Sequence, residues 1–543
     1  MIKRLACALL LLSSSNVAGV AAPPPPPPPK LIVAIAVDQL SADLFDAYAP
    51  LLTGGLGRLA QGIVYSNGYQ GHAATETCPG HSTMLSGLRP TRTRIIANSW
   101  IDQSLARADK TVLCAEDERA PLGPNGKFLP SPAHVEVAVL GDLMKRAWPG
   151  SRSVAISGKD RAALMMGGKR PDQRWFFDGQ RFITDRSDVL VPAVVPVINR
   201  LVAAKIAEAQ PGLDAPALCQ ARSAPVTLKG GMVVGSGNFT RSAGDAGGYR
   251  ASPALDGAVL ALSAALLREM KLGQGSSPDI LAVEVSATDY VGHSYGPGGQ
   301  EMCLQMLSLD RDLGDFMTML DSTGIDYALV LTGDHGSLDV PERLRLRGVA
   351  DAAWLAESAT TDAIGKVVGA QLGLGEDVLL GGNGGDVWVK ASLGAGDRAR
   401  VLSAASATFA ANPQVETVFT KAAIAATAVP SGKPSSWSLI ERARASFDPV
   451  RSGDLYVVLK KNVMPIVTPA KGYVSTHGTP WDYDRRVPVV FWRRPQFPAL
   501  RSEEVETVDI MPTMAAVLGL PLAPGSVDGK CLPVFANVRC PTE

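Results

Sequence analysis

The sequence predicts an α/β protein with a central, mostly parallel sheet, helices on both faces of that sheet and an inserted cap region. Two observations carry this prediction. Short uninterrupted apolar runs open into polar or charged residues, as is typical of strands buried on both faces of a parallel sheet. Segments with helical apolar spacing alternate with these runs, as expected when helices connect neighbouring parallel strands.

The predicted elements follow one another along the chain. The apolar runs are LIVAIAVDQL from residue 31, SVAISGKDR from 153, DILAVEVSATDY from 279, DYALVLTGDHG from 326, DLYVVLK from 454 and RRVPVVFWRR from 485. The clearest helical segments are residues 252–273 and 505–520. Between residues 167 and 250 the alternation fades, and Gly, Pro, Arg and aromatic residues dominate. We therefore expect a core formed by residues 31–166 and 251–543, with 167–250 as an insertion or cap packed over it.

The composition excludes a broad affinity for nucleic acid. The chain has 543 residues, of which 46% are hydrophobic, and Lys+Arg and Asp+Glu both number 52. Because these charges balance, we expect no specific nucleic-acid binding, and any anion has to be held by a local site. We expect a monomer.

The N-terminus has the pattern of an export signal. Residues 1–22 have a short basic start, an apolar run and small residues at the end, and a proline-rich linker follows at 23–30. The apolar run is too short for a membrane anchor, and no later stretch is long and apolar enough to be one. We therefore expect a periplasmic or secreted protein without a membrane anchor.

Six of the seven cysteines lie beyond this signal. An oxidising compartment permits disulfides, and six cysteines allow fifteen pairings. We expect Cys531 to pair with Cys540, its near neighbour, and assign no partners to the other four.

Acidic residues follow three of the predicted strands directly. Asp38, Asp289 and the pair Asp334–His335 stand where the carboxyl ends of the strands meet, which is the edge at which open α/β sheets place active sites. Each residue alone has an ordinary explanation, since an Asp after a strand is usually a turn former or a helix N-cap. Together they indicate a shared site.

Histidines complete a set of metal ligands. His293 lies four residues after Asp289, so both face one side of a helical turn. His477 stands beside Gly478, just before another strand. Three Asp and three His suit two Zn²⁺-like ions, and the ligand types leave Mn²⁺ and Fe open. Two such ions form a clamp for in-line displacement at phosphorus.

The stretch TETCPGHSTML at residues 75–85 supplies the candidate nucleophiles. Pro79 suits the first turn of a helix, and Gly80 permits the close approach of another group. Thr77 and Cys78 therefore lie where backbone N–H groups attract an anion. We favour Thr77, because a metal pair activates a hydroxyl, whereas the Cys78 thiol needs no such pair and could be held in a disulfide.

Three further residues are candidates for binding phosphoryl oxygens. Lys159 and Arg161 alternate after the SVAIS run and point to one side if the strand continues, whereas the ordinary fate of such a pair is a solvated surface. Asn98 in IIANSW offers a neutral donor, although an Asn there is also typical of a turn.

Motifs along nearly the whole mature chain resemble those of the alkaline phosphatase superfamily. They are AVDQLSADLF, ATETCPGHSTMLSG, RTRIIANSW, GKDRAALMMGG, SATDYVGHSYG, TGDHG and STHGTPWDYDRRVPVVFW. The chain is most similar to the PafA-like and sphingomonad-type secreted alkaline phosphatases with a threonine nucleophile. The resemblance implies an alkaline-phosphatase-like sheet. It also implies that one zinc is held by residues matching Asp289, His293 and His477, and the other by those matching Asp38, Thr77, Asp334 and His335. Residues matching Asn98, Lys159 and Arg161 contact the phosphoryl oxygens.

The resemblance implies a secreted, two-zinc alkaline phosphatase. Such an enzyme hydrolyses a broad range of phosphate monoesters to alcohol and inorganic phosphate through a phosphothreonine at Thr77. A phosphodiesterase or nucleotide pyrophosphatase of the same superfamily is the alternative, and Lys159 and Arg161 count against it. An additional Ca²⁺ is left open. The chain departs from its relatives after TGDHG, where SLDVPERLRL lacks an expected Gly and His.

Overall fold

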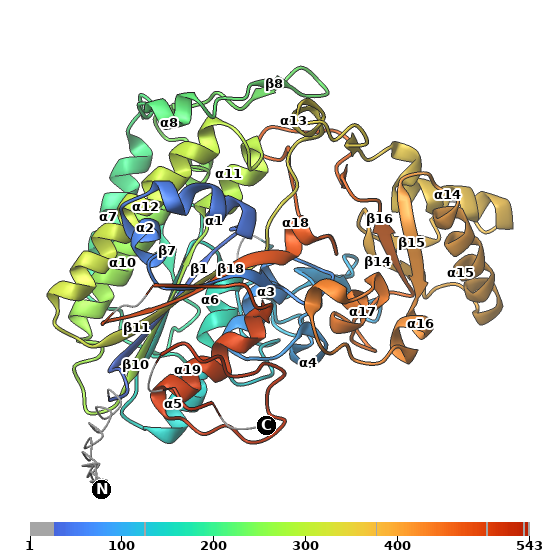
Figure 1. The fold of residues 1–543 in the computed structure, drawn as a ribbon. Coiled ribbons are helices and arrows are strands. Elements are labelled where there is room, and N and C mark those ends of the chain that lie inside the picture. Colours follow the sequence, from blue (N-terminus) through green and yellow to red (C-terminus); the bar gives the residue numbers. More distant parts are fainter. Residues whose placement is uncertain (1–26, 124–125, 376, 496–497, 536–537, 541–543) are drawn as a thin grey trace, which may run out of the picture.

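The computed structural model describes residues 27–123, 126–375, 377–495, 498–535 and 538–540. The expected export signal at 1–22 lies outside these residues, as does the first half of the expected linker. A large mixed sheet forms the centre of the molecule (Figure 1), which confirms the predicted fold class. Its strand order is β19-β2-β18-β11-β1-β10-β5-β6-β7, with β20 paired to β2. The strands are β1 (Leu31–Val37), β2 (Ile63–Tyr69), β5 (Ser153–Ser157), β6 (Gln173–Phe177), β7 (Phe182–Ile183), β10 (Asp279–Val285), β11 (Tyr327–Gly333), β18 (Arg486–Arg493), β19 (Ala499–Arg501) and β20 (Val505–Glu506).

The central strands are parallel, as predicted. β1 lies between β10 and β11, and β5 and β6 continue the parallel pairing on the β10 side. On the other side β18 runs antiparallel to both β11 and β2, and β7 at the far edge is antiparallel to β6. The sheet is therefore mostly parallel, with antiparallel strands added away from its centre.

Alternation along β1 shows why helices cover both faces. Leu31, Val33, Ile35 and Val37 belong to one buried cluster, and the intervening residues of the strand belong to another. Because successive side chains of a strand point to opposite faces, an apolar run without polar interruption needs cover on both sides. The first cluster is covered by α1 (Ala42–Tyr48), α2 (Gly55–Leu59), α7 (Val194–Ala207), α10 (Ala254–Glu269), α11 (Ala287–Tyr295) and α12 (Gln300–Ser322). The second is covered by α3 (Thr77–Met84), α5 (Leu140–Ala147), α6 (Asp160–Gly167) and α19 (Ile510–Leu518).

A separate four-stranded sheet forms a second lobe, at the right of Figure 1. Its order is β13-β14-β16-β15, with every neighbouring pair antiparallel. The elements are β13 (Leu379–Gly381), β14 (Gly385–Val389), β15 (Val415–Thr420) and β16 (Leu455–Leu459), packed against α14 (Thr361–Leu372) and α15 (Ala395–Ala410). The DLYVVLK run therefore forms a buried strand as predicted, but in this lobe and not in the central sheet.

The segment 167–250, expected as an insertion, has two parts. Its first strands, β6 and β7, extend the central sheet. The remainder runs over the face that α10 and α12 cover. It consists of α7, α8 (Ala217–Gln220), the β8–β9 hairpin (Val226–Thr227 and Val233–Val234) and α9 (Ala246–Arg250). A disulfide between Cys219 and Cys303 joins α8 to α12.

Shorter elements complete the described chain. They are α4 (Pro90–Thr93), the β3–β4 hairpin (Ser99–Ile101 and Thr111–Leu113), α13 (Pro341–Leu346), β12 (Ala353–Trp354), α16 (Lys421–Ala426), α17 (Leu439–Ala445), β17 (Val463–Met464) and α18 (Asp482–Arg485). The predicted Cys531–Cys540 disulfide is present, and Cys78 pairs with Cys114. Within the described residues, no helix has both the length and the apolar composition needed to cross a bilayer.

Candidate active site

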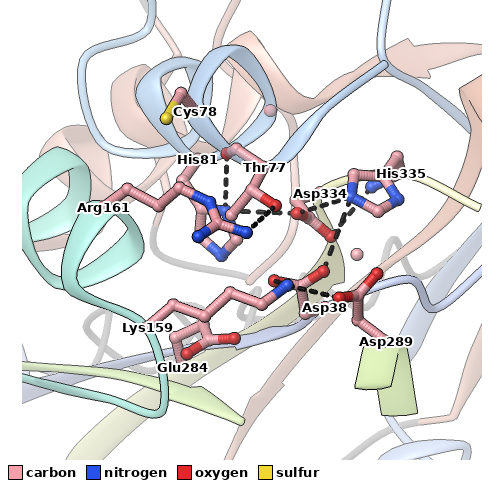
Figure 2. A network of polar contacts seen from close by, with 12 residues as sticks. Asp38, Thr77, Cys78, His81, Lys159, Arg161, Glu284, Asp289, Asp334 and His335 are labelled. Atoms are coloured by element: carbon pink, nitrogen blue, oxygen red, sulfur yellow. Dashed lines mark hydrogen bonds and ion pairs between the residues drawn. The ribbon is translucent and has the colours of Figure 1, made fainter. Parts of the chain in front are cut away.

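The carboxyl ends of three central strands bring the predicted acidic residues together. Val37 of β1 pairs in register with Val285 of β10 and with Gly333 of β11. The residues that follow these three strands therefore leave the sheet side by side. Asp38 and Asp334 come directly after β1 and β11, and Asp289 lies in the first turn of α11 (Figure 2).

The predicted histidines lie against these carboxylates. His335 Nε2 is 3.1 Å from Asp334 Oδ2 and 3.5 Å from Asp38 Oδ1. His293 Nε2 is 3.2 Å from Asp289 Oδ1, and His477 Nε2 is 3.6 Å from the same oxygen. The rings of His335 and His477 stack with their centroids 3.5 Å apart. All six residues predicted as Asp and His ligands thus meet at one edge of the sheet.

The hydrogen bonds of the histidines fit a role as metal ligands. Nδ1 of His293, His335 and His477 lies 2.6–2.9 Å from the backbone carbonyl of Ser475, Gly336 and Thr75, respectively. A carbonyl oxygen can only accept, so Nδ1 of each ring carries the hydrogen and Nε2 is the nitrogen that faces the carboxylates. Metal-binding histidines are usually oriented in this way by a hydrogen bond from the other ring nitrogen.

Buried polar atoms that make no hydrogen bond mark the same place. Asp38 Oδ1, Asp334 Oδ2 and His335 Nε2 make no hydrogen bond with any described residue, although all three side chains are fully buried. Such atoms are costly unless a ligand satisfies them. Two sets of three residues each have donor atoms that all lie within 4.8 Å of one another. One set is Asp289, His335 and His477, and the other is Asp38, His81 and Asp334. The donor set therefore fits divalent cations of the zinc type.

The crowded charges shift the pKa values of the site. Burial, together with the charge of Asp334, raises the pKa of Asp38 well above its usual value, although Lys159 opposes the change. Burial disfavours the charged form of His335, but the carboxylates of Asp334, Asp38 and Asp289 together outweigh that effect and raise the pKa of His335 to about 9. Carboxylates this close together favour a cation between them.

The nucleophile candidate stands at the start of α3. Thr77 is the first residue of the helix, and Glu76 is its N-cap. A Cβ at Gly80 would lie 2.3 Å from the backbone oxygen of Asp334, so only glycine lets the helix approach β11 so closely. Cys78 is held in the disulfide with Cys114 and has no free thiol. Thr77 is the hydroxyl left facing the ligand group.

Lys159 and Arg161 reach the site by a different path from the predicted one. The expectation that the strand continues through them is wrong, because β5 ends at Ser157 and α6 begins at Asp160. Arg161 Nη2 lies 3.4 Å from Thr77 Oγ1 (Figure 2). Lys159 Nζ lies 2.7 Å from Asp38 Oδ2 and 2.6 Å from Asp289 Oδ2, so it faces the ligand carboxylates.

Asn98 lies just before β3 and contacts the first turn of α3. Its Oδ1 accepts a 2.8 Å hydrogen bond from the backbone N–H of Cys78. Since an N–H needs an acceptor, this contact identifies the oxygen of the amide and leaves the Nδ2 group as a donor. Asn98 and Arg161 line one cavity of about 1000 Å³ together with His293 and His477.

The second lobe forms the opposite wall of this cavity. Gly381, Asn383, Trp388 and Tyr456 line it from the four-stranded sheet. Segment 167–250 lines a neighbouring cavity of about 380 Å³ through residues such as Phe177, and Arg161 lines both cavities. The catalytic cavity therefore lies between the central sheet and the second lobe.

Several residues of the site were not identified from the sequence. Gln39 donates from its backbone N–H to Asp334 and from Nε2 to Asp289, and it has a positive φ of 66°. A non-glycine residue in this conformation is uncommon and often marks a functional site. Its position directly after Asp38 was the signal available. His81 Nδ1 lies 2.8 Å from Thr77 O and 3.3 Å from Asp334 Oδ2.

Glu284 is a second residue that the sequence did not reveal. Its carboxylate accepts from the backbone N–H of Gly158 and from the hydroxyl of Ser286, and it also contacts Ser157 Oγ. Ser157 Oγ in turn accepts a 2.7 Å hydrogen bond from the backbone N–H of Lys159. Glu284 thus holds the loop from which Lys159 and Arg161 extend (Figure 2). It is hidden inside an apolar run, where periodicity carries no functional signal.

Comparison with known proteins places these features in a family. The family model of type I phosphodiesterase / nucleotide pyrophosphatase matches residues 32–480. The chain is 48% identical over 512 residues to the alkaline phosphatase PhoK of Sphingomonas sp., covering 94% of this chain and 91% of PhoK. It is 42% identical over 521 residues to the alkaline phosphatase PhoD of Zymomonas mobilis, covering 95% and 90%. The crystal structure of the alkaline phosphatase PafA superposes with a TM-score of 0.80 at 24% identity, covering 94% of this chain and 99% of PafA.

Proposed function

The chain belongs to the type I phosphodiesterase / nucleotide pyrophosphatase family of the alkaline phosphatase superfamily, and from this premise we propose that it is a zinc-dependent alkaline phosphatase. It hydrolyses phosphate monoesters to alcohol and inorganic phosphate through a phosphothreonine at Thr77. The observation that carries the proposal is the meeting of Thr77, the six Asp and His ligands and Arg161 at one buried edge of the sheet. The named relatives are alkaline phosphatases, which supports the same activity.

Two groups of residues would hold the ions. We assign Asp289, His293 and His477 to one ion, and Asp38, Thr77, Asp334 and His335 to the other. When bound, two such ions lower the pKa of a nearby hydroxyl and neutralise charge that develops at phosphorus.

The reaction at Thr77 has two displacements. Thr77 loses its hydroxyl proton, its Oγ1 forms a bond to phosphorus, and the bond from phosphorus to the alcohol oxygen breaks. The alcohol leaves with a proton. Water then loses a proton and forms a bond to phosphorus, the bond to Oγ1 breaks, Oγ1 regains a proton, and inorganic phosphate leaves. The position of Thr77 at the start of α3 helps, because the backbone N–H groups of the first turn favour negative charge there.

Arg161, Asn98 and Lys159 suit the non-bridging oxygens of a monoester. Arg161 extends from α6 to the hydroxyl of Thr77, and the amide of Asn98 contacts the backbone N–H of the next residue, Cys78. Lys159 adds positive charge beside the ligands. Fixed donors of this kind stabilise a charged transition state, and removal of one such donor typically lowers the rate by about 10²–10³-fold. A diester carries one charge less on these oxygens, so it gains less from the three residues.

The rival is a phosphodiesterase or nucleotide pyrophosphatase, the activity after which the matching family is described. The test is the ratio of kcat/KM for p-nitrophenyl phosphate to kcat/KM for bis-p-nitrophenyl phosphate, measured with zinc present. We expect a ratio far above one. A ratio below one would assign the chain to the diesterases while keeping Thr77 and the ligands. EDTA should abolish activity and added Zn²⁺ should restore it.

We further propose that the enzyme is exported and has a broad range of monoester substrates. Three disulfides, Cys78–Cys114, Cys219–Cys303 and Cys531–Cys540, are typical of an oxidising compartment. Comparing cell fractions by immunoblot tests the location. Retention of the full-length protein in the cytosol would contradict it.

A further inference from the structure

The residues on both sides of the nucleophile hold Asn98. We propose that Glu76 and the Cys78–Cys114 disulfide together position the Asn98 amide for the phosphoryl group, so that they act as positioning residues of the reaction. The inference rests on the proposed function, in which Asn98 binds a phosphoryl oxygen. It adds two elements to that function, a carboxylate and a covalent bridge, neither of which touches the substrate.

Direct contacts connect Asn98 to α3. The backbone N–H of Cys78 donates to Asn98 Oδ1 at 2.8 Å. The backbone N–H of Asn98 donates to Glu76 Oε2 at 2.6 Å. Glu76 and Cys78 are the immediate neighbours of Thr77 in the chain. The separation between the nucleophile and the Asn98 amide is therefore set by local bonds and does not depend on the packing of distant elements.

The Cys78–Cys114 disulfide adds a further connection between Asn98 and α3. The backbone N–H of Cys114 donates to Asn98 O at 2.9 Å, and the next residues pair as Ser99 with Leu113. Cys114 is bonded to Cys78, whose N–H holds the Asn98 side chain. Asn98 is thus bound at its side chain, its N–H and its carbonyl by residues that the disulfide and the Glu76–Thr77–Cys78 segment keep together.

Asn98 needs such support because the central sheet does not supply it. β3 and β4 have three residues each and pair only with one another, so two short strands outside the main sheet carry this residue. A two-stranded hairpin of this size is marginally stable by itself. A misplacement of about 1 Å in a group that contacts the reacting atoms can cost about 10²-fold in rate. Loss of the bridge or of Glu76 should therefore lower activity through Asn98.

Glu76 is suited to this task because its Oε2 accepts from the backbone N–H of Asn98. Gln at this position keeps an oxygen that can accept from Asn98, whereas Ala removes it. The two substitutions therefore separate positioning from a role of the charge.

A mutant cycle with Asn98→Ala tests the proposal. The variants Cys78→Ala/Cys114→Ala, Glu76→Ala and Glu76→Gln are made in the wild-type and in the N98A background. The enzyme is loaded with zinc, and kcat/KM is measured for p-nitrophenyl phosphate and for its diester. Cys219→Ala/Cys303→Ala is the matched control, because it removes the disulfide between α8 and α12.

In the wild-type background, we expect monoester kcat/KM to fall about tenfold for the disulfide and Glu76→Ala variants. The diester should lose less, and Glu76→Gln should retain most of the activity. In the N98A background the same changes should have no further effect, because the residue on which they act is gone. The control should lower the melting temperature and leave both kcat/KM values unchanged.

Losses of equal size in both backgrounds would overturn the proposal, since they would mean that Glu76 and the disulfide act on Thr77 or on folding. If the disulfide variant does not fold, the Glu76→Ala and Glu76→Gln pair decides the question by itself. If N98A alone leaves monoester activity unchanged, the positioning proposal fails together with the assigned role of Asn98. The phosphatase activity and the ligand set, tested by zinc and EDTA, would still stand.

Discussion

The two halves of the active site are built in different ways. The ligand group stands at the ends of strands that pair in register, so the backbone of the central sheet determines its position. The phosphoryl-binding group is carried by the loop after β5, the start of α6 and the segment before β3, and side-chain hydrogen bonds hold these segments in place. In the proposed enzyme the fold would therefore hold the ions, whereas the discrimination between esters would depend on a few local contacts.

The first prediction removes the proposed nucleophile from the ligand half. Thr77→Ala should lower kcat for p-nitrophenyl phosphate by on the order of 10⁴-fold or more, as loss of a nucleophile does elsewhere. Acid quenching with a ³²P-labelled monoester should trap label on wild-type enzyme and none on the variant. Thr77→Ser keeps a hydroxyl and should retain both activity and labelling. Label on Thr77→Ala would assign the nucleophile to another residue.

The second prediction breaks the phosphoryl half and leaves the ligands in place. Lys159→Ala combined with Arg161→Ala should reduce monoester kcat/KM by roughly 10²–10³-fold or more, because two fixed cationic donors are lost. Diester kcat/KM should fall far less. Zinc content, measured by atomic absorption, should stay near that of the wild type. Equal losses for both esters would remove the two residues from phosphoryl recognition.

The same difference explains how far the sequence alone could lead. Asp38, Asp289 and Asp334 follow uninterrupted apolar runs, and parallel strands must bring their carboxyl ends to one edge, so these residues could be identified by position. Lys159 and Arg161 were assigned to one side of a continuing strand, but a helix begins at Asp160. The backbone that precedes them is held by Glu284, which lies 126 positions after Gly158, and local spacing does not reveal such a contact.

The second lobe was missed for a related reason. The run that forms β16 has the same apolar pattern as the central strands, and periodicity does not tell which sheet a buried strand joins. Whether Leu455–Leu459 pairs with β14 and β15 or with the central sheet is decided by long-range packing. For the same reason the wall formed by Trp388 and Tyr456 could not be anticipated.

The third prediction removes a contact that supports the phosphoryl-binding residues. Glu284→Gln replaces one carboxylate oxygen by an NH2 group, which cannot accept a hydrogen bond, so a single oxygen is left for the Gly158 N–H and the Ser286 hydroxyl. The loop that carries Lys159 should shift, and monoester kcat/KM should fall about tenfold, with a smaller loss for the diester. Glu301→Gln is the matched control, since buried Glu301 also accepts backbone N–H groups, from Gly235 and Gly237, in a different loop. A similar loss in both variants would indicate a general effect on folding.

The last prediction concerns the support of the ligand half and should affect stability more than turnover. Buried Asp256 accepts from the backbone N–H of Ala287 at the start of α11, the helix that carries Asp289. Burial, reinforced by nearby Glu284, raises the pKa of Asp256 to about 8. A raised folded-state pKa means that the folded protein binds the proton more tightly. This stabilisation is complete below the unfolded pKa near 4 and is lost as pH rises to about 8, at up to about 1.4 kcal/mol per pH unit.

Asp256→Asn isolates this effect, because asparagine mimics the protonated carboxyl. The side-chain oxygen of the new asparagine can accept from the backbone N–H of Ala287. If the Gln305 amide is reversed, the NH2 group of the new asparagine can donate to Gln305 Oε1, which has no hydrogen-bond partner among the described residues. We expect the melting temperature of the variant relative to wild type to rise between pH 6 and pH 9, with both proteins zinc-loaded in matched buffers. A constant difference across this range would show that Asp256 is ionised throughout. The ligand half would then have a charged support, and its stability would not decline toward the alkaline range in which a phosphatase of this kind is expected to work.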